Sequence, residues 1–80
     1  MVQPRQFRLA QSYRQKLEAG RVQGILESPR YSGRTWTVQS LYEMLLNDHG
    51  ALAVTYDAAL MRSIVDELVT RNVLEPAGGP

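Results

Sequence analysis

Apolar residues recur at spacings of three and four in three stretches of this chain, and this spacing predicts three amphipathic helices. The first stretch runs from Gln6 to Glu27, the second from Thr37 to His49, and the third from about Tyr56 to Arg71. The apolar face of each consists of Phe7, Ala10, Tyr13, Leu17, Val22, Ile25 and Leu26 in the first, Val38, Leu41, Met44 and Leu45 in the second, and Leu60, Met61, Ile64, Val65 and Leu68 in the third.

Two glycines weaken the middle of the first predicted helix. Gly20 and Gly24 each cost ~1 kcal/mol relative to alanine, so either the helix is continuous to Glu27 or it breaks near Gly20. We favour a continuous or slightly bent helix, because no proline interrupts it before Pro29. The Ser28-Pro29 pair ends the helix, since the residue before a proline is pushed out of the helical region.

Capping residues set the expected ends of the other two helices. Thr37 is expected to cap the second helix by accepting a backbone N–H with its hydroxyl. Gly50 is expected to end that helix in the left-handed conformation, and residues 51–54 would then form the turn. Thr55 is the expected N-cap of the third helix, and Asn72 is expected to end it, again in the left-handed conformation.

The short apolar pair Val73-Leu74 predicts an extended segment after the third helix. This segment allows a strand pair between residues 35–37 and 73–75. The predicted fold class is therefore mostly α, a three-helix domain with at most a short two-stranded β element.

The length predicts a single domain over residues 1–80, with its core between about residues 7 and 75 and flexible ends at 1–5 and 76–80. A chain of this size buries only about 60–65% of the surface that its unfolded form exposes. Its core is expected to contribute a modest stability, roughly 3–5 kcal/mol.

The composition excludes several classes of protein. The sequence contains no cysteine, so it forms no disulfide and no thiolate metal site. The first ten residues lack the apolar run of a signal peptide, and no stretch approaches the ~18 apolar residues of a membrane helix. We therefore expect a cytoplasmic protein that does not enter a membrane.

Charge is divided unevenly along the chain, although the net charge is only +1. Residues 1–34 contain seven Lys or Arg against two Glu, a balance of +5, whereas residues 35–80 contain two Arg against six acidic residues, a balance of −4. The division indicates either a polyanion contact on the basic half or an attraction between the two halves, within one copy or between two.

No group of residues has the spacing of a catalytic or metal-binding site. His49, the only histidine, is expected in the last turn of a helix, where a histidine usually interacts with the helix dipole. Asp66 and Glu67 are adjacent on a helix, so their carboxylates diverge. We therefore expect no enzymatic activity, no cofactor, no metal and no small-molecule substrate.

One pattern resembles a known family. A leucine-rich segment at Leu41 to Leu45 is followed by Gly50, by Val54-Thr55 and by a helix that leads to the exit Leu68-Val69-Thr70-Arg71-Asn72-Val73-Leu74. This order is similar to winged helix-turn-helix domains, in particular to small ArsR-like bacterial or phage regulators, over about residues 18–76. The exit has Asn72 where the family usually has glycine. The resemblance implies a three-helix winged-helix-like domain with a truncated wing that binds DNA and regulates transcription.

The resemblance also implies that the helix from Tyr56 is the recognition helix, whose first residues enter the major groove. Its exposed reading positions would be Tyr56, Asp57, Ala59, Arg62 and Ser63. Arg62 alone among them can make a bidentate contact to guanine. This half of the chain is acidic, however, and nonspecific affinity for DNA comes chiefly from Lys and Arg on phosphates.

The basic residues of the first half are the other candidates for DNA contacts. Arg5, Arg8 and Arg34 are expected on phosphates, and Arg30 lies in the same basic loop as Arg34. For the N-terminal arginines, an ordinary solvated helix face is an equally good interpretation. Tyr31 and Trp36 could stack on bases, although packing in a core or an interface is the more common role of such residues. The full set of DNA-binding candidates is Arg5, Arg8, Arg30, Arg34, Tyr56 and Arg62.

A protein-interaction or adaptor module that does not bind DNA, such as one encoded by a phage, is the alternative. The acidic third helix, the truncated wing and the small core favour this interpretation. An exposed stripe of Phe7, Tyr13 and Leu17 would then contact a second copy or another protein.

Overall fold

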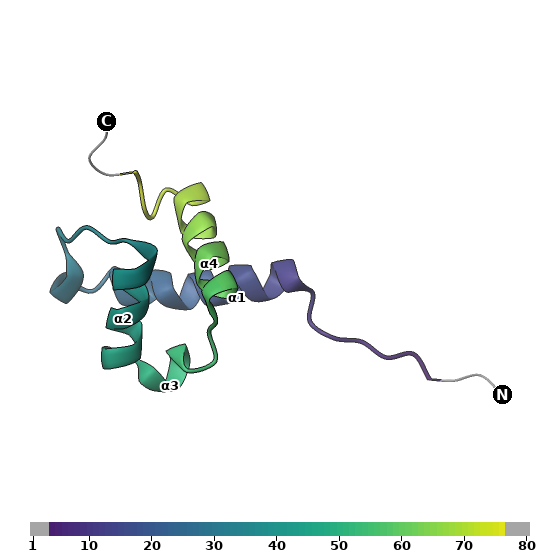
Figure 1. Cartoon of the computed structure of the whole chain (residues 1–80). Coiled ribbons are helices and arrows are strands. Elements are labelled where there is room, and N and C mark those ends of the chain that lie inside the picture. The colour runs from purple at the N-terminus through teal and green to yellow at the C-terminus, as the bar shows by residue number, and fades with distance from the viewer. Residues whose placement is uncertain (1–3, 77–80) are drawn as a thin grey trace.

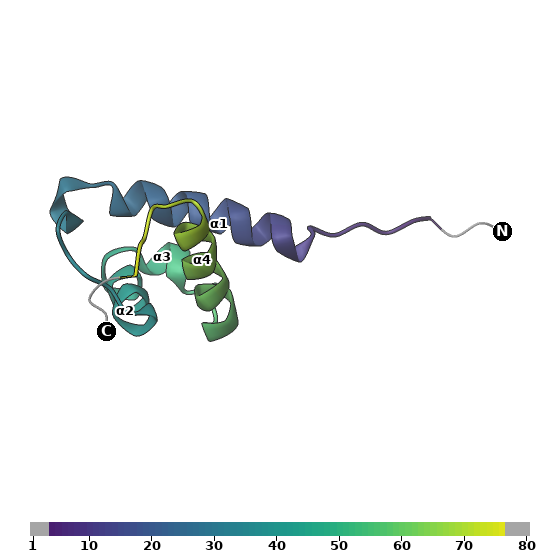
Figure 2. The same cartoon turned by 90° about the horizontal axis from the view of Figure 1, so that it is seen from above.

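A computed structural model describes residues 4–76, and most of these residues are helical. The elements are α1 (Gln11–Leu26), the 3-10 helix η1 (Pro29–Tyr31), α2 (Val38–Asp48), α3 (Gly50–Ala53) and α4 (Ala58–Thr70) (Figure 1). Helices α2, α3 and α4 lie on one side of α1 (Figure 2). Helix α4 packs against α1, and α2 packs against α3 and α4.

The prediction of a mostly α fold is confirmed, and the strand pair that the sequence allowed between residues 35–37 and 73–75 does not form. Both segments are extended or bent, and no strand occurs between residues 4 and 76. The expected flexible ends at 1–3 and 77–80 lie outside the described residues.

Helix α1 begins at Gln11 rather than at Gln6, so the expected start of the first helix was wrong. Residues 4–10 form an extended N-terminal arm that leaves the body of the molecule (Figures 1 and 2). Phe7 and Leu9 in this arm are 87% and 64% exposed. Most helical stability in proteins comes from packing of an apolar face. Within residues 4–76 no other element covers Phe7, and Ala10 at the N-cap position makes no side-chain cap, so neither packing nor a cap favours a longer helix toward the N-terminus.

The buried face of α1 also differs from the expected one. Glu18, Ala19 and Val22 are buried, whereas Tyr13 and Leu17 lie on the exposed side. The small side chain of Ala19, which is fully buried, lets α4 approach α1 closely. The helix is continuous through Gly20, which we expected because no proline interrupts it before Pro29.

Helix α2 begins with the expected Thr37 cap, which is part of a reciprocal capping box. The Thr37 hydroxyl accepts the Ser40 N–H at 2.9 Å, and the Ser40 hydroxyl accepts the Thr37 N–H at 2.8 Å. Both bonds pair backbone N–H groups that have no partner within the helix.

Thr37→Ala is therefore expected to destabilise the protein by about 1 kcal/mol, because it leaves the Ser40 N–H without its cap. Urea unfolding followed by circular dichroism measures this change. Thr35→Ala is the matched control, since Thr35 is exposed and makes no side-chain hydrogen bond within residues 4–76. Equal stability of the two variants would contradict the capping role.

The connection between α2 and α4 is a short helix rather than the expected turn. Gly50 opens α3 and has no positive φ, so its predicted left-handed conformation was wrong. The chain instead changes direction at His49, with φ −139° and ψ 47°, and the His49 carbonyl accepts the N–H groups of Leu52 and Ala53. Because this carbonyl closes a new helical turn, no left-handed residue is needed.

Asp57, and not Thr55, caps α4. The Asp57 carboxylate accepts the Leu60 N–H at 2.7 Å, whereas the Thr55 hydroxyl donates to the carbonyl of Leu52. Asp and Thr are both good N-cap residues. Tyr56 is buried and precedes the helix, so the cap falls on the residue after it.

Asn72 ends the α4 region in the left-handed conformation, as predicted, with φ 61°. Its N–H donates to the Val69 carbonyl, and the N–H of Val73 donates to the Leu68 carbonyl at 2.9 Å. These are the two bonds of a Schellman motif. The chain then turns back along the body of the protein.

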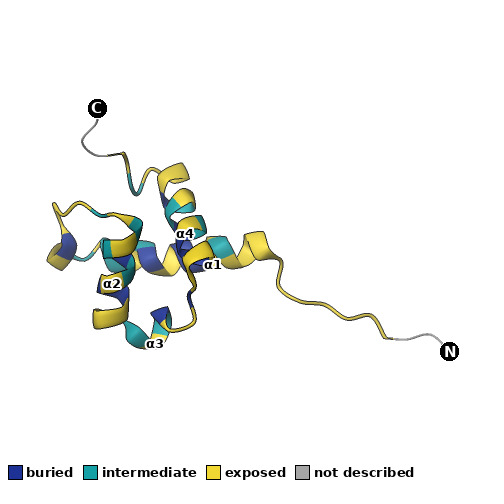
Figure 3. Cartoon of the chain, in the orientation of Figure 1, coloured by how far each residue is buried: buried dark blue, intermediate teal, exposed yellow. Residues whose placement is uncertain are grey.

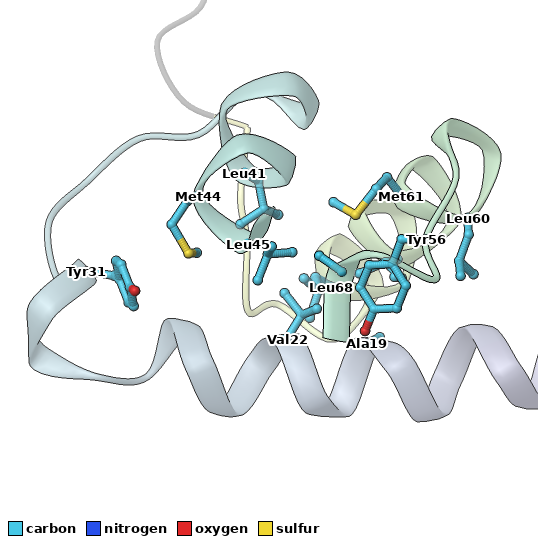
Figure 4. Packing of buried hydrophobic residues seen from close by; sticks show 12 residues of the cluster. Ala19, Val22, Tyr31, Leu41, Met44, Leu45, Tyr56, Leu60, Met61 and Leu68 are labelled. Atoms are coloured by element: carbon cyan, nitrogen blue, oxygen red, sulfur yellow. The ribbon is translucent and has the colours of Figure 1, made fainter. Parts of the chain in front are cut away.

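The core lies between α1, α2 and α4 (Figures 3 and 4). Its largest fully buried side chains are Val22, Leu41, Leu45, Met61, Ile64 and Leu68. Polar interactions at the edge of the core also join α1 and α4. Arg71 donates to the Lys16 carbonyl at 3.0 Å and forms a salt bridge with Glu67 at 2.9 Å. Arg71 thereby joins the end of α4 to the middle of α1.

Candidate nucleic-acid interface

The N-terminal arm holds two of the predicted DNA-binding residues. Arg5 and Arg8 are exposed, and the extended backbone separates them from the helical body. Among residues 4–76, neither guanidinium lies within salt-bridge distance of a carboxylate. Both positive charges are thus available to an outside anion.

One contact fixes the base of this arm relative to α4. Arg14, in the first turn of α1, donates from Nη2 to the Thr55 carbonyl at 3.3 Å. Thr55 lies three residues before Ala58, the first residue of α4. The next residue of α1, Gln15, donates to the Ser63 carbonyl at 2.9 Å. The arm therefore leaves the body beside the turn that opens α4.

Helix α4 offers few groups for reading DNA. Arg62 is exposed, as expected, and makes no ion pair within the described part of the chain. Asp57 uses its carboxylate as the helix cap, and Ser63 is half-buried. Ala59 is exposed but has no polar side chain. Arg62 is thus the only cation on the outer face of this helix.

Tyr56 is not a reading position, and its prediction as a DNA-binding residue was wrong. The side chain is 4% exposed and points toward α1 (Figure 4). Its hydroxyl donates to Glu18 Oε2 at 2.5 Å. The apolar ring is more stable in the core than in water, and the partly buried hydroxyl requires a partner, which Glu18 supplies.

Glu18 is the centre of this buried polar contact. Its Oε1 accepts a hydrogen bond from Arg21 at 2.7 Å, so both carboxylate oxygens have partners. Burial of the phenol and its hydrogen bond to Glu18 raise the pKa of Tyr56 well above its usual value. Both effects disfavour the phenolate. The neutral phenol and the carboxylate therefore hold α1 against the start of α4.

The basic loop after α1 is more constrained than the arm. Arg30 lies 3.5 Å from Asp48 Oδ2, and its guanidinium is 5.7 Å from the centre of the Tyr31 ring. Arg34 stacks over Trp36 at 4.6 Å, which leaves its guanidinium exposed and without a carboxylate among the described residues. Arg34 is the better placed of the two for a phosphate contact.

Tyr31 and Trp36 both pack against the protein, which is the more common role expected for them. Tyr31 is buried, meets Trp36 edge to face with ring centres 5.9 Å apart, and donates its hydroxyl to Asp48 at 2.8 Å. This hydrogen bond raises the pKa of Tyr31. Trp36 is half-buried beside the core, with Arg34 on its face.

The predicted interface residues do not form one helical stripe. Phe7 belongs to the arm, whereas Tyr13 and Leu17 lie on α1 and are 52% and 36% exposed. All three are accessible, but only Phe7 projects from the body. The arm also contains Leu9, which the helical pattern did not single out.

The described residues form a hollow that the sequence did not predict, here named the Trp36 groove. It lies between residues 33–37 and 73–76, has Ser40, Val65 and Val69 along its length, and has a volume of about 730 Å³. The apolar residues after Asn72 were the available signal. Val73 and Leu74 indicated an extended segment in the sequence, and in the structure they line this groove.

Other kinds of site find no support in residues 4–76. No cluster of three or more His, Asp or Glu side chains could hold a metal ion there. In the same part of the chain, no helix has the length and apolar character needed to cross a bilayer. Comparison with family models, curated proteins and solved structures found no match.

Proposed function

We propose that this protein binds duplex DNA through its N-terminal arm and acts as a small transcriptional regulator. The observation that supports this proposal is the position of Arg5 and Arg8. They are exposed, have no carboxylate within salt-bridge distance in the described chain, and stand on an arm whose base lies beside the turn before α4. An extended basic arm next to a helix-turn-helix unit is a known means of contacting a groove and its phosphates.

The division of charge gives the arm the main role in affinity. Arg62 is the only exposed cation of α4, and Asp66 lies one turn further along the same exposed side. In this proposal α4 contacts the edge of the major groove through Arg62, and Arg5 and Arg8 bind phosphates of the neighbouring minor groove. Arg34 supplies a further phosphate contact from the opposite end of α1.

Removing both arm arginines is expected to weaken DNA binding at least tenfold at low salt, and to reduce the slope of log K against log salt by about 2, because two phosphate contacts are lost. Fluorescence anisotropy of a labelled random duplex, titrated with the Arg5→Ala/Arg8→Ala variant at several salt concentrations, measures both quantities.

A single charge elsewhere provides the control. Lys16→Ala and Arg8→Ala each remove one positive charge, but Lys16 lies on α1 and not on the arm. A larger loss for Arg8→Ala supports a specific arm contact. Equal losses would show that only the net charge acts, and no binding by the wild-type protein at low salt would exclude the DNA proposal.

A further inference from the structure

The Trp36 groove has the character of a site for an extended peptide. Its walls are residues 33–37 and 73–76, in which Gly33 lies in a turn and residues 73–74 form a bend, and its apolar lining includes Trp36, Val65 and Val69. Such a surface is favourable for apolar side chains, since their burial removes them from water.

The walls also offer unused backbone groups. Within residues 4–76, the backbone N–H and C=O groups of Thr35, Trp36 and Glu75 make no hydrogen bond. A segment with free backbone groups can accept an added strand by β-augmentation. The groove therefore provides both apolar contacts and a backbone edge.

The N-terminal arm has the matching chemistry. It is extended, and in a strand residues two apart share a face, so Arg5, Phe7 and Leu9 lie on one side. Phe7 is 87% exposed and Leu9 is 64% exposed. Seven extended residues span roughly 23 Å, which is long enough to run along a groove of this kind.

We propose that the arm of a second copy of this chain binds in the Trp36 groove, with Phe7 and Leu9 against its apolar surface. The arm leaves the N-terminal end of α1, whereas residues 33–37, one wall of the groove, come after its C-terminal end, and α1 is a helix of about 24 Å at 1.5 Å per residue (Figure 1). The arm points away from the groove of its own copy. Reciprocal exchange between two copies closes the assembly as a dimer.

One charge pair is available to this assembly. The arm carries Arg5 and Arg8 and no acidic residue, and the groove has Glu75 on one wall, while Arg34 on the other wall is held over the Trp36 ring. Arg5 shares the face of Phe7 and can meet Glu75, so only Arg8, on the opposite face, stays available to DNA while the arm is bound. The proposal does not depend on DNA binding, because it rests on the apolar residues of the arm.

Trp36 provides a direct signal for the test, because it is the only tryptophan and lines the groove. A synthetic peptide of residues 1–12, which contains neither Trp nor Tyr, is titrated into dilute full-length protein. We expect saturable binding with a change in Trp36 fluorescence. The same peptide with Phe7→Ser is expected to bind at least about tenfold more weakly, because it lacks its main anchor.

Two variants of the full chain locate the site. Val69→Arg places a charged side chain in the groove, and Val54→Arg adds the same charge at a 72% exposed position outside it. Val69→Arg is expected to reduce peptide affinity at least about tenfold, whereas Val54→Arg leaves it within about twofold. Binding that Val69→Arg does not weaken, or no binding at all, would overturn the proposal.

Sedimentation velocity over a concentration series tests the dimer itself. Wild type and Val54→Arg are expected to dimerise, while Phe7→Ser and Val69→Arg remain monomers. A mixture of these two monomeric variants should form a heterodimer, because one supplies an intact arm and the other an intact groove. A wild-type monomer at all concentrations, or a dimer that survives both substitutions, would overturn the proposal.

Discussion

Leu68→Ala is expected to lower the free energy of unfolding by about 2–5 kcal/mol and to leave much of the protein unfolded at 37 °C. Leu68 is fully buried in α4 and faces α1 near Val22 (Figure 4). The substitution opens a cavity at the α1–α4 contact. Because a core of this size rarely contributes more than ~3–5 kcal/mol, the loss is comparable with the whole stability.

Thermal and urea unfolding followed by circular dichroism measure this effect. Val69→Ala is the matched control, since Val69 is the next residue of α4 and is 40% exposed. Its effect should stay within about 1 kcal/mol. Similar melting temperatures for the two variants would contradict the placement of Leu68 in the core.

Tyr56→Phe is expected to destabilise the protein by roughly 1–3 kcal/mol near neutral pH. The substitution keeps the buried ring but removes the hydroxyl that donates to Glu18 Oε2. Glu18 is 5% exposed, so the carboxylate oxygen that loses this bond has little access to water in compensation. Urea unfolding at pH 7 gives the difference, and an unchanged stability would show that the Tyr56–Glu18 bond makes no net contribution.

The same substitution is expected to change the dependence of stability on alkaline pH. The pKa of Tyr56 is raised in the folded protein above its ordinary value of 10.0, so the folded state binds the phenolic proton more tightly than the unfolded state. This contribution is fully present below pH 10 and is lost as the pH rises above that value. The wild-type protein should therefore lose stability more steeply above pH 10 than Tyr56→Phe does.

Tyr13→Phe is the control for this pH dependence, because Tyr13 is 52% exposed and makes no side-chain hydrogen bond among the described residues. It should follow the wild-type pH profile. A parallel fall of stability in wild type and Tyr56→Phe would contradict a raised Tyr56 pKa.

The sequence predicted those parts of the fold that local signals determine. Thr37 caps α2 and Asn72 closes α4, because a hydroxyl at an N-cap and a left-handed asparagine act on nearby backbone groups only. The core positions of α2 and α4 also follow from their periodicity. Leu41, Leu45 and Ile64 are all fully buried.

The features that depend on tertiary contacts could not be predicted in this way. Whether Phe7 belongs to a helix depends on an element that would cover it, and none of the described elements does. The face of α1 that is buried depends on where α4 crosses it, at Ala19. Asp57 and Thr55 are both suitable caps, and the burial of Tyr56 against Glu18 decides between them.

The candidate site shows the same limit. The sequence identified Arg5, Arg8, Arg34 and Arg62 as exposed cations, and they are exposed. It could not place Arg14 against the Thr55 carbonyl, the contact that fixes the arm beside α4. The Trp36 groove could not be predicted either. It is formed by the segment before α2 and the segment after α4, which do not pair as strands.

The contacts between α1 and α4 have a consequence for the order of folding. Arg14 and Thr55 are 41 residues apart in sequence, and Lys16 and Arg71 are 55 apart, so docking of α1 closes a long loop. Helices α2, α3 and α4 are joined by short connections and can associate with a smaller loss of chain entropy. We expect these three helices to assemble first and α1 to dock last, which makes α1 and its arm the part of the molecule that opens most readily.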